Sequence, residues 1–94
     1  MTVQSWPLPK DPQASLRYRF DWGAKRLPPG VTIEDSIFIT EGSVVLSDKS
    51  IDGGFTSVRV SGGEDGEVVD ITNRVTLSNG DIQDQTGRLR IRSQ

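Results

Sequence analysis

The chain of 94 residues contains neither cysteine nor histidine. The lack of cysteine excludes disulfides and thiolate metal sites, and the lack of histidine removes the commonest metal ligand and the usual general base of enzymes. The sequence contains no run of about 18 apolar residues, so no membrane-spanning helix is predicted. Residues 1–5 have neither the basic nor the apolar stretch of a signal peptide. We therefore expect a protein that is made in a cytoplasm, is not an enzyme, has no cofactor and does not bind membranes.

The chain also lacks a strong excess of either charge, because its net charge is only −2. The charges are nevertheless segregated: residues 1–33 sum to +3, residues 34–84 to −8 and residues 85–94 to +3. Nucleic-acid-binding proteins more often carry an excess of positive charge, so we expect no nucleic-acid partner. The segregation favours docking between copies of the chain or onto another protein, although solvated surface charges give the same pattern.

The clearest pattern that is present lies in residues 57–80, where apolar and polar residues alternate with period two on either side of a glycine-rich turn. Period two places one set of side chains on a buried face and the other toward solvent, as in a β-strand. A second turn is predicted at Asn79-Gly80, with Ile82 marking a short extension of the hairpin. Strands are expected over residues 15–22, 31–40, 43–46, 55–61, 67–78 and 87–93.

Strands of this length with frequent turns predict an all-β fold: an immunoglobulin-like antiparallel β-sandwich of about six to seven strands, with an extended N-terminal arm. A small barrel is the alternative. Residues 37–39 are consecutively apolar, which predicts a β-bulge or burial on both sides there, whereas residues 47–54 are interpreted as a polar loop. The aromatic residues Tyr18, Phe20 and Trp22 are expected in the core.

The arm comprises residues 1–14, ahead of a sandwich domain at residues 15–94. Three prolines between positions 7 and 12 favour an extended conformation over a helix or a central strand. The arm also carries Trp6 and Leu8. Trp6 either folds back onto its own domain or anchors the arm on a neighbouring subunit, and the sequence leaves both interpretations open.

The candidate partner-binding residues are the large apolar side chains of the arm and the arginines of the first and last sandwich strands. These two strands often lie close together in immunoglobulin-like sandwiches, so the arginines could merge into one basic surface that meets an acidic neighbour. Protection of edge strands by charge is the other interpretation. The candidates are Trp6, Leu8, Arg17, Arg19, Arg88, Arg90 and Arg92.

Acidic residues gather near the glycine turn and again between residues 48 and 52. Calcium sites draw about six to eight oxygen ligands from such loops, but neither segment has the regular alternate-position spacing of a calcium loop. Glu64-Asp65-Gly66 is typical of an ordinary solvated turn. Paired carboxylates could also hydrolyse glycosides, yet a sandwich of this size offers little depth for a cleft. We therefore predict no catalytic, cofactor or metal site.

Short motifs spread over residues 16–92 resemble those of a family of small phage proteins, the fiber–tail adaptors, which have an immunoglobulin-like fold. This chain has Val31 where that family tends to have aspartate, and Phe38 where it tends to have tryptophan. The motifs are Asp21-Trp22, Leu27, Gly30, Thr32-Ile33, Phe38, Ser61-Gly62-Gly63, Gly66, Thr72-Asn73 and Arg88-Leu89-Arg90-Ile91-Arg92.

The resemblance implies a structural virion protein of a phage tail, assembled in the host cytoplasm, that joins the portal and tail assembly to tail fibers. Its partners would be copies of itself and other tail proteins. A carbohydrate- or host-surface-binding module of a phage tail is the alternative. Such modules usually present exposed aromatic rings, and only Trp6 and Phe55 are candidates for that role.

Overall fold

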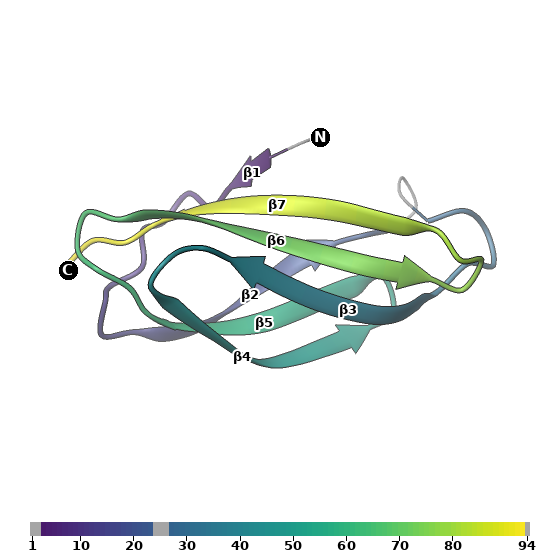
Figure 1. Cartoon of the computed structure of the whole chain (residues 1–94), viewed down its shortest axis with the longest axis horizontal. Coiled ribbons are helices and arrows are strands. Elements are labelled where there is room, and N and C mark those ends of the chain that lie inside the picture. The colour runs from purple at the N-terminus through teal and green to yellow at the C-terminus, as the bar shows by residue number, and fades with distance from the viewer. Residues whose placement is uncertain (1–2, 24–26, 94) are drawn as a thin grey trace.

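The computed structural model describes residues 3–23 and 27–93. Over these residues the chain is all-β, with seven strands in two sheets that form a sandwich (Figure 1). One sheet has the strand order β1-β7-β6-β3 and the other the order β2-β5-β4. The strands are β1 (Val3–Ser5), β2 (Ser15–Asp21), β3 (Ile33–Thr40), β4 (Val44–Asp52), β5 (Phe55–Gly62), β6 (Val68–Leu77) and β7 (Ile82–Arg90).

The all-β sandwich predicted from the alternating pattern is confirmed, while the specifically immunoglobulin-like assignment stays a prediction. Neighbouring strands are antiparallel except for β1, which runs parallel to β7. The predicted turn at Asn79-Gly80 joins β6 to β7, and Gly80 has a φ of 92°, which suits glycine. The described segments contain no helix that is long and apolar enough to span a membrane.

The core lies between the two sheets and receives apolar side chains from both. Phe20 and Trp22 are fully buried, as predicted, and Tyr18 is half-buried against the same cluster. Period-two strands create this core because every second side chain of β2, β5 and β6 points inward. The buried apolar residues are Phe20, Trp22, Ile33, Val44, Val58, Val60, Val69, Ile71, Val75, Leu77, Leu89 and Ile91.

A hydrogen-bonded polar cluster crosses the core at Asn73, which is completely buried on β6. The Asn73 Oδ1 atom accepts from Trp22 Nε1 at 2.9 Å and from the Thr56 hydroxyl. Its Nδ2 group donates to Ser36 Oγ at 2.8 Å and to the Ile37 carbonyl at 2.9 Å. One amide side chain therefore links β3 of one sheet to Trp22, which follows β2, and to Thr56 of β5 in the other sheet, and so fixes how the two sheets face each other.

The predicted polar loop at residues 47–54 is wrong, because β4 continues through it to Asp52. The strand passes an irregularity between Ser47 and Ser50, where Asp48 has a φ of 53°. Most side chains of this segment are exposed, so their polarity suits an edge strand held by backbone pairing with β5. Lys49 then reaches across and donates to the Ser36 carbonyl on β3 at 2.7 Å.

The bulge expected at residues 37–39 is also misplaced, since the register shift in β3 falls between Ile33 and Asp35. Regular alternation then turns Ile37 and Ile39 to the outer face, where they are 40% and 41% exposed. The last strand differs from expectation as well. It begins at Ile82 and pairs with β6 along its whole length, instead of beginning at residue 87.

Candidate docking surfaces

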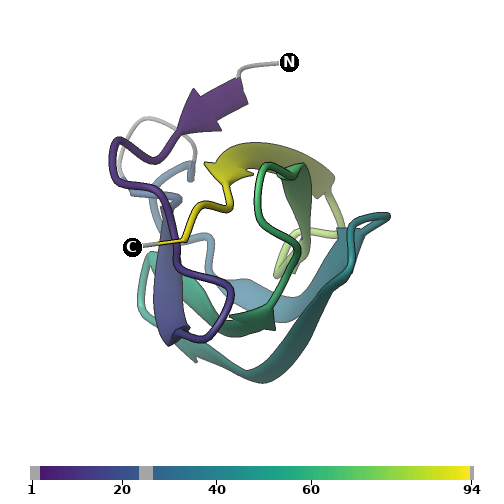
Figure 2. The ribbon, with the colours of Figure 1, turned by 90° about the vertical axis from the view of Figure 1, so that its left-hand side faces the viewer.

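The N-terminal arm lies along one flank of the sandwich and is bonded to the last strand (Figure 2). The short strand β1, which the sequence did not predict, pairs with Thr86, Gly87 and Arg88 of β7. Further along, the Lys10 amide donates to the Arg90 carbonyl at 2.9 Å, and the Arg92 amide donates to the Lys10 carbonyl at 2.9 Å. The arm therefore closes the open side between the two sheets.

Trp6 packs onto its own domain at this closure. Its ring centroid lies 4.8 Å from that of Tyr18 and 5.5 Å from that of Phe20, both in edge-on arrangements. Gly87 provides the space, because a Cβ atom there would lie 2.2 Å from Cη2 of the Trp6 ring. The structure thus shows the folded-back placement within one chain, and anchoring of the arm on a neighbouring subunit stays a prediction.

Lys10 fastens the end of the arm and is completely buried. Its Nζ group donates to the Gly62 carbonyl at 2.6 Å and to the Asp11 carbonyl at 2.9 Å. Burial lowers the pKa of this amine, while the neighbouring Asp11 carboxylate opposes that shift. The arm is therefore held by a backbone ladder, an aromatic contact and a buried lysine.

The first candidate surface is a groove of about 510 Å³ between the arm and β2, here called the arm groove. Leu8 stands between two prolines and is 76% exposed, and Leu16 is 44% exposed. The groove has a cationic side because two arginines of β2 border it. Its lining residues are Trp6, Pro7, Leu8, Pro9, Leu16, Arg17, Tyr18 and Arg19.

The predicted arginines are divided between strands of the two sheets. Arg17 and Arg19 lie on β2 in the three-stranded sheet, whereas Arg88 and Arg90 lie on β7 in the other sheet. Arg92 follows the end of β7 and is exposed.

Most of these arginines already have contacts within the chain. Arg17 forms an ion pair with Asp48 at 2.6 Å, and Arg88 forms one with Asp70 at 2.9 Å. Arg90 donates to the Pro7 carbonyl at 3.0 Å. The Arg19 guanidinium lies 4.6 Å above the Phe55 ring and has no carboxylate partner among the described residues.

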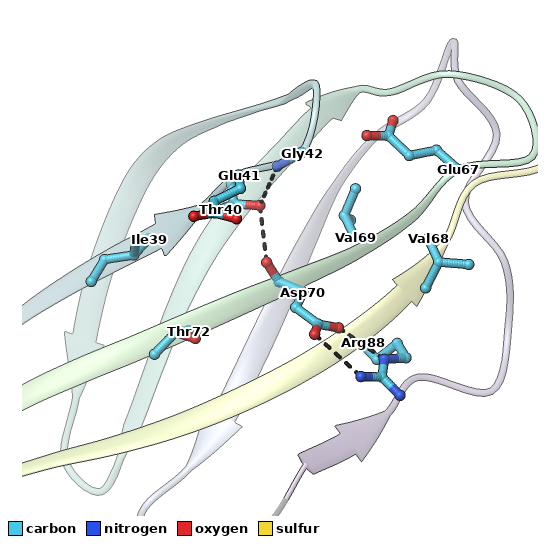
Figure 3. A pocket seen from close by; sticks show the side chains of 10 residues that line it. All are labelled: Ile39, Thr40, Glu41, Gly42, Glu67, Val68, Val69, Asp70, Thr72 and Arg88. Carbon is cyan, nitrogen blue, oxygen red and sulfur yellow. Dashed lines mark hydrogen bonds and ion pairs between the residues drawn. The ribbon is translucent and has the colours of Figure 1, made fainter.

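The second candidate surface was missed by sequence reasoning. It is a groove of about 720 Å³ on the outer face of the four-stranded sheet, here called the sheet groove (Figure 3). Ile39 and Val68 supply exposed apolar surface, at 41% and 56% exposure. The signal is the apolar run at residues 37–39, for which the sequence predicts a bulge or burial on both sides. The lining residues are Ile39, Thr40, Glu41, Gly42, Glu67, Val68, Val69, Asp70, Thr72 and Arg88.

The sheet groove has an acidic rim. Figure 3 shows Arg88 facing Asp70 across its floor, and this contact lowers the pKa of the Asp70 carboxyl, chiefly through the hydrogen bond from Arg88. The Glu67 carboxylate accepts hydrogen bonds from the Ser43 hydroxyl at 2.5 Å and from the Glu64 amide at 3.0 Å, and so contacts the turns at these two residues. Glu41 is exposed and forms no ion pair within the described segments.

We found no arrangement of three or more acidic side chains able to hold a metal ion in the described parts of the chain. In the acidic cluster near the glycine turn, Glu67 binds protein groups of the neighbouring turns. Both of its carboxylate oxygens accept hydrogen bonds from the turns at Ser43 and Glu64. The cluster therefore joins two loops at one end of the sandwich.

We expect Glu67→Gln to weaken the dependence of stability on acid. The pKa of Glu67 lies below its ordinary value of 4.5, mainly because the Ser43 side chain and then the Ser43 and Glu64 amides donate to it. A carboxyl whose folded pKa is depressed stabilises the fold above its ordinary pKa, and that contribution is lost as pH falls through the lower folded pKa.

Below pH 4.5 the melting temperature should therefore fall more steeply for the wild type than for Glu67→Gln. Thermal unfolding followed by circular dichroism across this range measures both slopes. Glu41→Gln is the matched control, since it removes a neighbouring carboxylate that makes no such hydrogen bonds. Equal acid slopes for the wild type and Glu67→Gln would show that these loop contacts do not persist in solution.

Comparison with known proteins identifies the class to which this small sandwich belongs, a family of structural proteins of phage tails. Residues 10–90 match the family described as podophage GP4 fiber-tail adaptor protein gp77, and the chain belongs to that family. The match confirms the resemblance found in the sequence motifs. It begins at Lys10, so Trp6 and Leu8 lie outside it. No curated protein is significantly similar to the chain.

Proposed function

We propose that this protein is a non-enzymatic adaptor that joins the portal and tail assembly of a phage to its tail fibers through protein–protein contacts. The family match over residues 10–90 carries the proposal. The adaptor would be made and assembled in the host cytoplasm and would act in several copies. It would need no cofactor, nucleic acid or membrane.

The surface of the sandwich supports a protein-binding role. Exposed apolar side chains gather along both grooves, and patches of this kind bordered by charge are typical of protein-binding sites. The arm groove exposes Leu8 and Leu16, and the sheet groove exposes Ile39 and Val68. The two grooves share no lining residue, so one subunit has room for two different contacts at once.

The structure offers less support for a carbohydrate-binding module. Trp6, one of the two aromatic candidates for sugar stacking, packs edge-on against Tyr18 and Phe20. Phe55 is 37% exposed, but the Arg19 guanidinium covers its ring at 4.6 Å. The Trp6 ring is thus engaged with its own domain, and one face of the Phe55 ring is occupied.

The proposal is tested with phage particles made in cells that lack this chain. We expect these particles to retain the portal and lose their tail fibers, and supply of the wild-type chain during assembly should restore the fibers. Particle composition is measured by denaturing gel and mass spectrometry, and fibers are counted by electron microscopy. Particles that carry fibers at the wild-type level without this chain would refute the adaptor function.

A further inference from the structure

The two grooves of one molecule have opposite charge. The sheet groove is lined by Glu41, Glu67 and Asp70 against the single cation Arg88, which is already paired with Asp70. The arm groove is lined by two arginines and no acid, and of these Arg17 is paired with Asp48 outside the lining while Arg19 has no carboxylate partner among the described residues. Both grooves also expose apolar side chains. The two surfaces are therefore complementary in charge and alike in offering hydrophobic contact area.

The arm presents a preorganised knob. Leu8 is the most exposed large apolar side chain of the described residues, at 76%, and stands between Pro7 and Pro9. The flanking backbone is fixed by proline and by the bond from Arg90 to the Pro7 carbonyl at 3.0 Å. Docking such a rigid segment costs little conformational entropy. Beside it on β2, Arg19 lacks a carboxylate partner in the described segments.

The sheet groove is a receptor of matching character. Ile39 of β3 and Val68 of β6 lie on opposite sides of the groove and expose apolar surface against which a leucine side chain can pack (Figure 3). Glu41 stands at the rim without an ion pair among the described residues, within reach of an incoming cation. The knob and the receptor lie on different sides of one molecule, the flank covered by the arm and the outer face of the four-stranded sheet, so a single chain does not join them to each other.

We propose that copies of this chain associate head to tail, with Leu8 and Arg19 of one copy docked in the sheet groove of the next. The inference rests on the proposed function, in which several adaptors act together on one tail. A second copy is the occupant that the charges favour, because one chain carries both the cationic knob and the acidic receptor. Contacts between two different surfaces are heterologous, and they close into a ring or extend into a filament.

The experiment breaks each half of the contact separately. Arg19→Glu reverses the charge of the knob and leaves the receptor unchanged. Glu41→Arg reverses the charge at the rim of the receptor and leaves the knob unchanged. The wild type should show concentration-dependent assembly by sedimentation velocity, weakened by added salt because exposed charges are screened. Each single variant should raise the dissociation constant about tenfold, and Leu8→Ala should do the same through lost apolar burial.

Mixing the two charge variants provides the sharpest measurement. An intact receptor on Arg19→Glu then meets an intact knob on Glu41→Arg, and the reversed knob of the first variant meets the reversed receptor of the second, so the mixture should regain assembly with the two variants alternating. The double variant with both reversals should regain assembly. Arg92→Glu and Ile82→Ala are matched controls, since both residues are exposed and line neither groove, and they should assemble as the wild type does.

A wild-type chain that stays monomeric at every concentration, or a mixture that assembles no better than either variant alone, would overturn the head-to-tail contact. Variants that assemble normally would overturn it too. Circular dichroism melting shows that each variant is folded, which is expected because the altered side chains are exposed. These outcomes are independent of the particle experiment: loss of fibers without this chain, together with a monomeric wild type, would leave the adaptor function standing and remove only this contact.

Discussion

Asn73→Leu is expected to lower the free energy of unfolding by about 4 kcal/mol, because it removes four hydrogen bonds from buried groups of the core. The groups that lose a bond are Trp22 Nε1, which keeps its longer bond to the Thr56 hydroxyl at 3.3 Å, the Ser36 and Thr56 hydroxyls and the Ile37 carbonyl. Leucine is similar in size to asparagine, so the loss comes from unpaired donors and acceptors and not from an empty cavity. Small domains are stable by only about 5–15 kcal/mol, so the change removes a large fraction of the total.

Chemical denaturation monitored by tryptophan fluorescence and by circular dichroism measures this loss. Thr72→Leu is the matched control, because Thr72 is the adjacent residue of β6, points to the outer face and bonds only the Thr86 hydroxyl in the described structure. Its effect should stay below about 1 kcal/mol. An unchanged midpoint for Asn73→Leu would mean that the buried cluster does not hold the two sheets together.

Gly87→Ala is expected to displace Trp6 and to destabilise the protein by about 1–3 kcal/mol, the usual cost of overpacking. The added Cβ atom would lie 2.2 Å and 2.5 Å from two carbons of the Trp6 ring. Gly87 lies in β7, pairs with Gln4 of β1 and does not have a positive φ. Its backbone conformation therefore suits alanine, and only the Trp6 ring obstructs the added methyl group. Displacement of the ring would also weaken the contact of Trp6 with Tyr18 and Phe20.

A double-mutant cycle isolates this contact. Trp6→Ala alone should cost about 3 kcal/mol through lost burial, but adding Gly87→Ala to it should cost almost nothing, because the obstructing ring has gone. Gly54→Ala is a control, since a Cβ atom there would approach no atom closer than 3.5 Å. Strictly additive costs for the two substitutions would show that Trp6 does not occupy this position in solution.

The sequence predicted the parts of the fold in which local pattern and tertiary role agree. The alternation along β6 placed Asn73 on the same face as its apolar neighbours, and the structure confirms that it points inward. The aromatic residues of β2 and the turn at Asn79-Gly80 were predicted for similar reasons. In each case the local pattern is sufficient, because a period of two indicates which side chains are buried and a turn dipeptide indicates where the chain reverses.

The errors fall where long-range pairing overrides local composition. The polar second half of β4 has no strand pattern of its own, and it is a strand because β5 lies beside it. The strand β1 precedes a proline-rich segment and depends on β7, which is almost a whole chain length away. The sheet groove was hidden for a related reason, since residues 37–39 look the same whether a bulge buries them or alternation exposes two of them.

The pairing of the arm with the end of the chain sets an order of events during synthesis. Residues 3–10 are translated before their partners at residues 86–92. The flank of the sandwich therefore stays open until residues 86–92 have left the ribosome, and Trp6 has no packing site before Gly87 emerges. A nascent chain that has not yet released these residues lacks the finished knob.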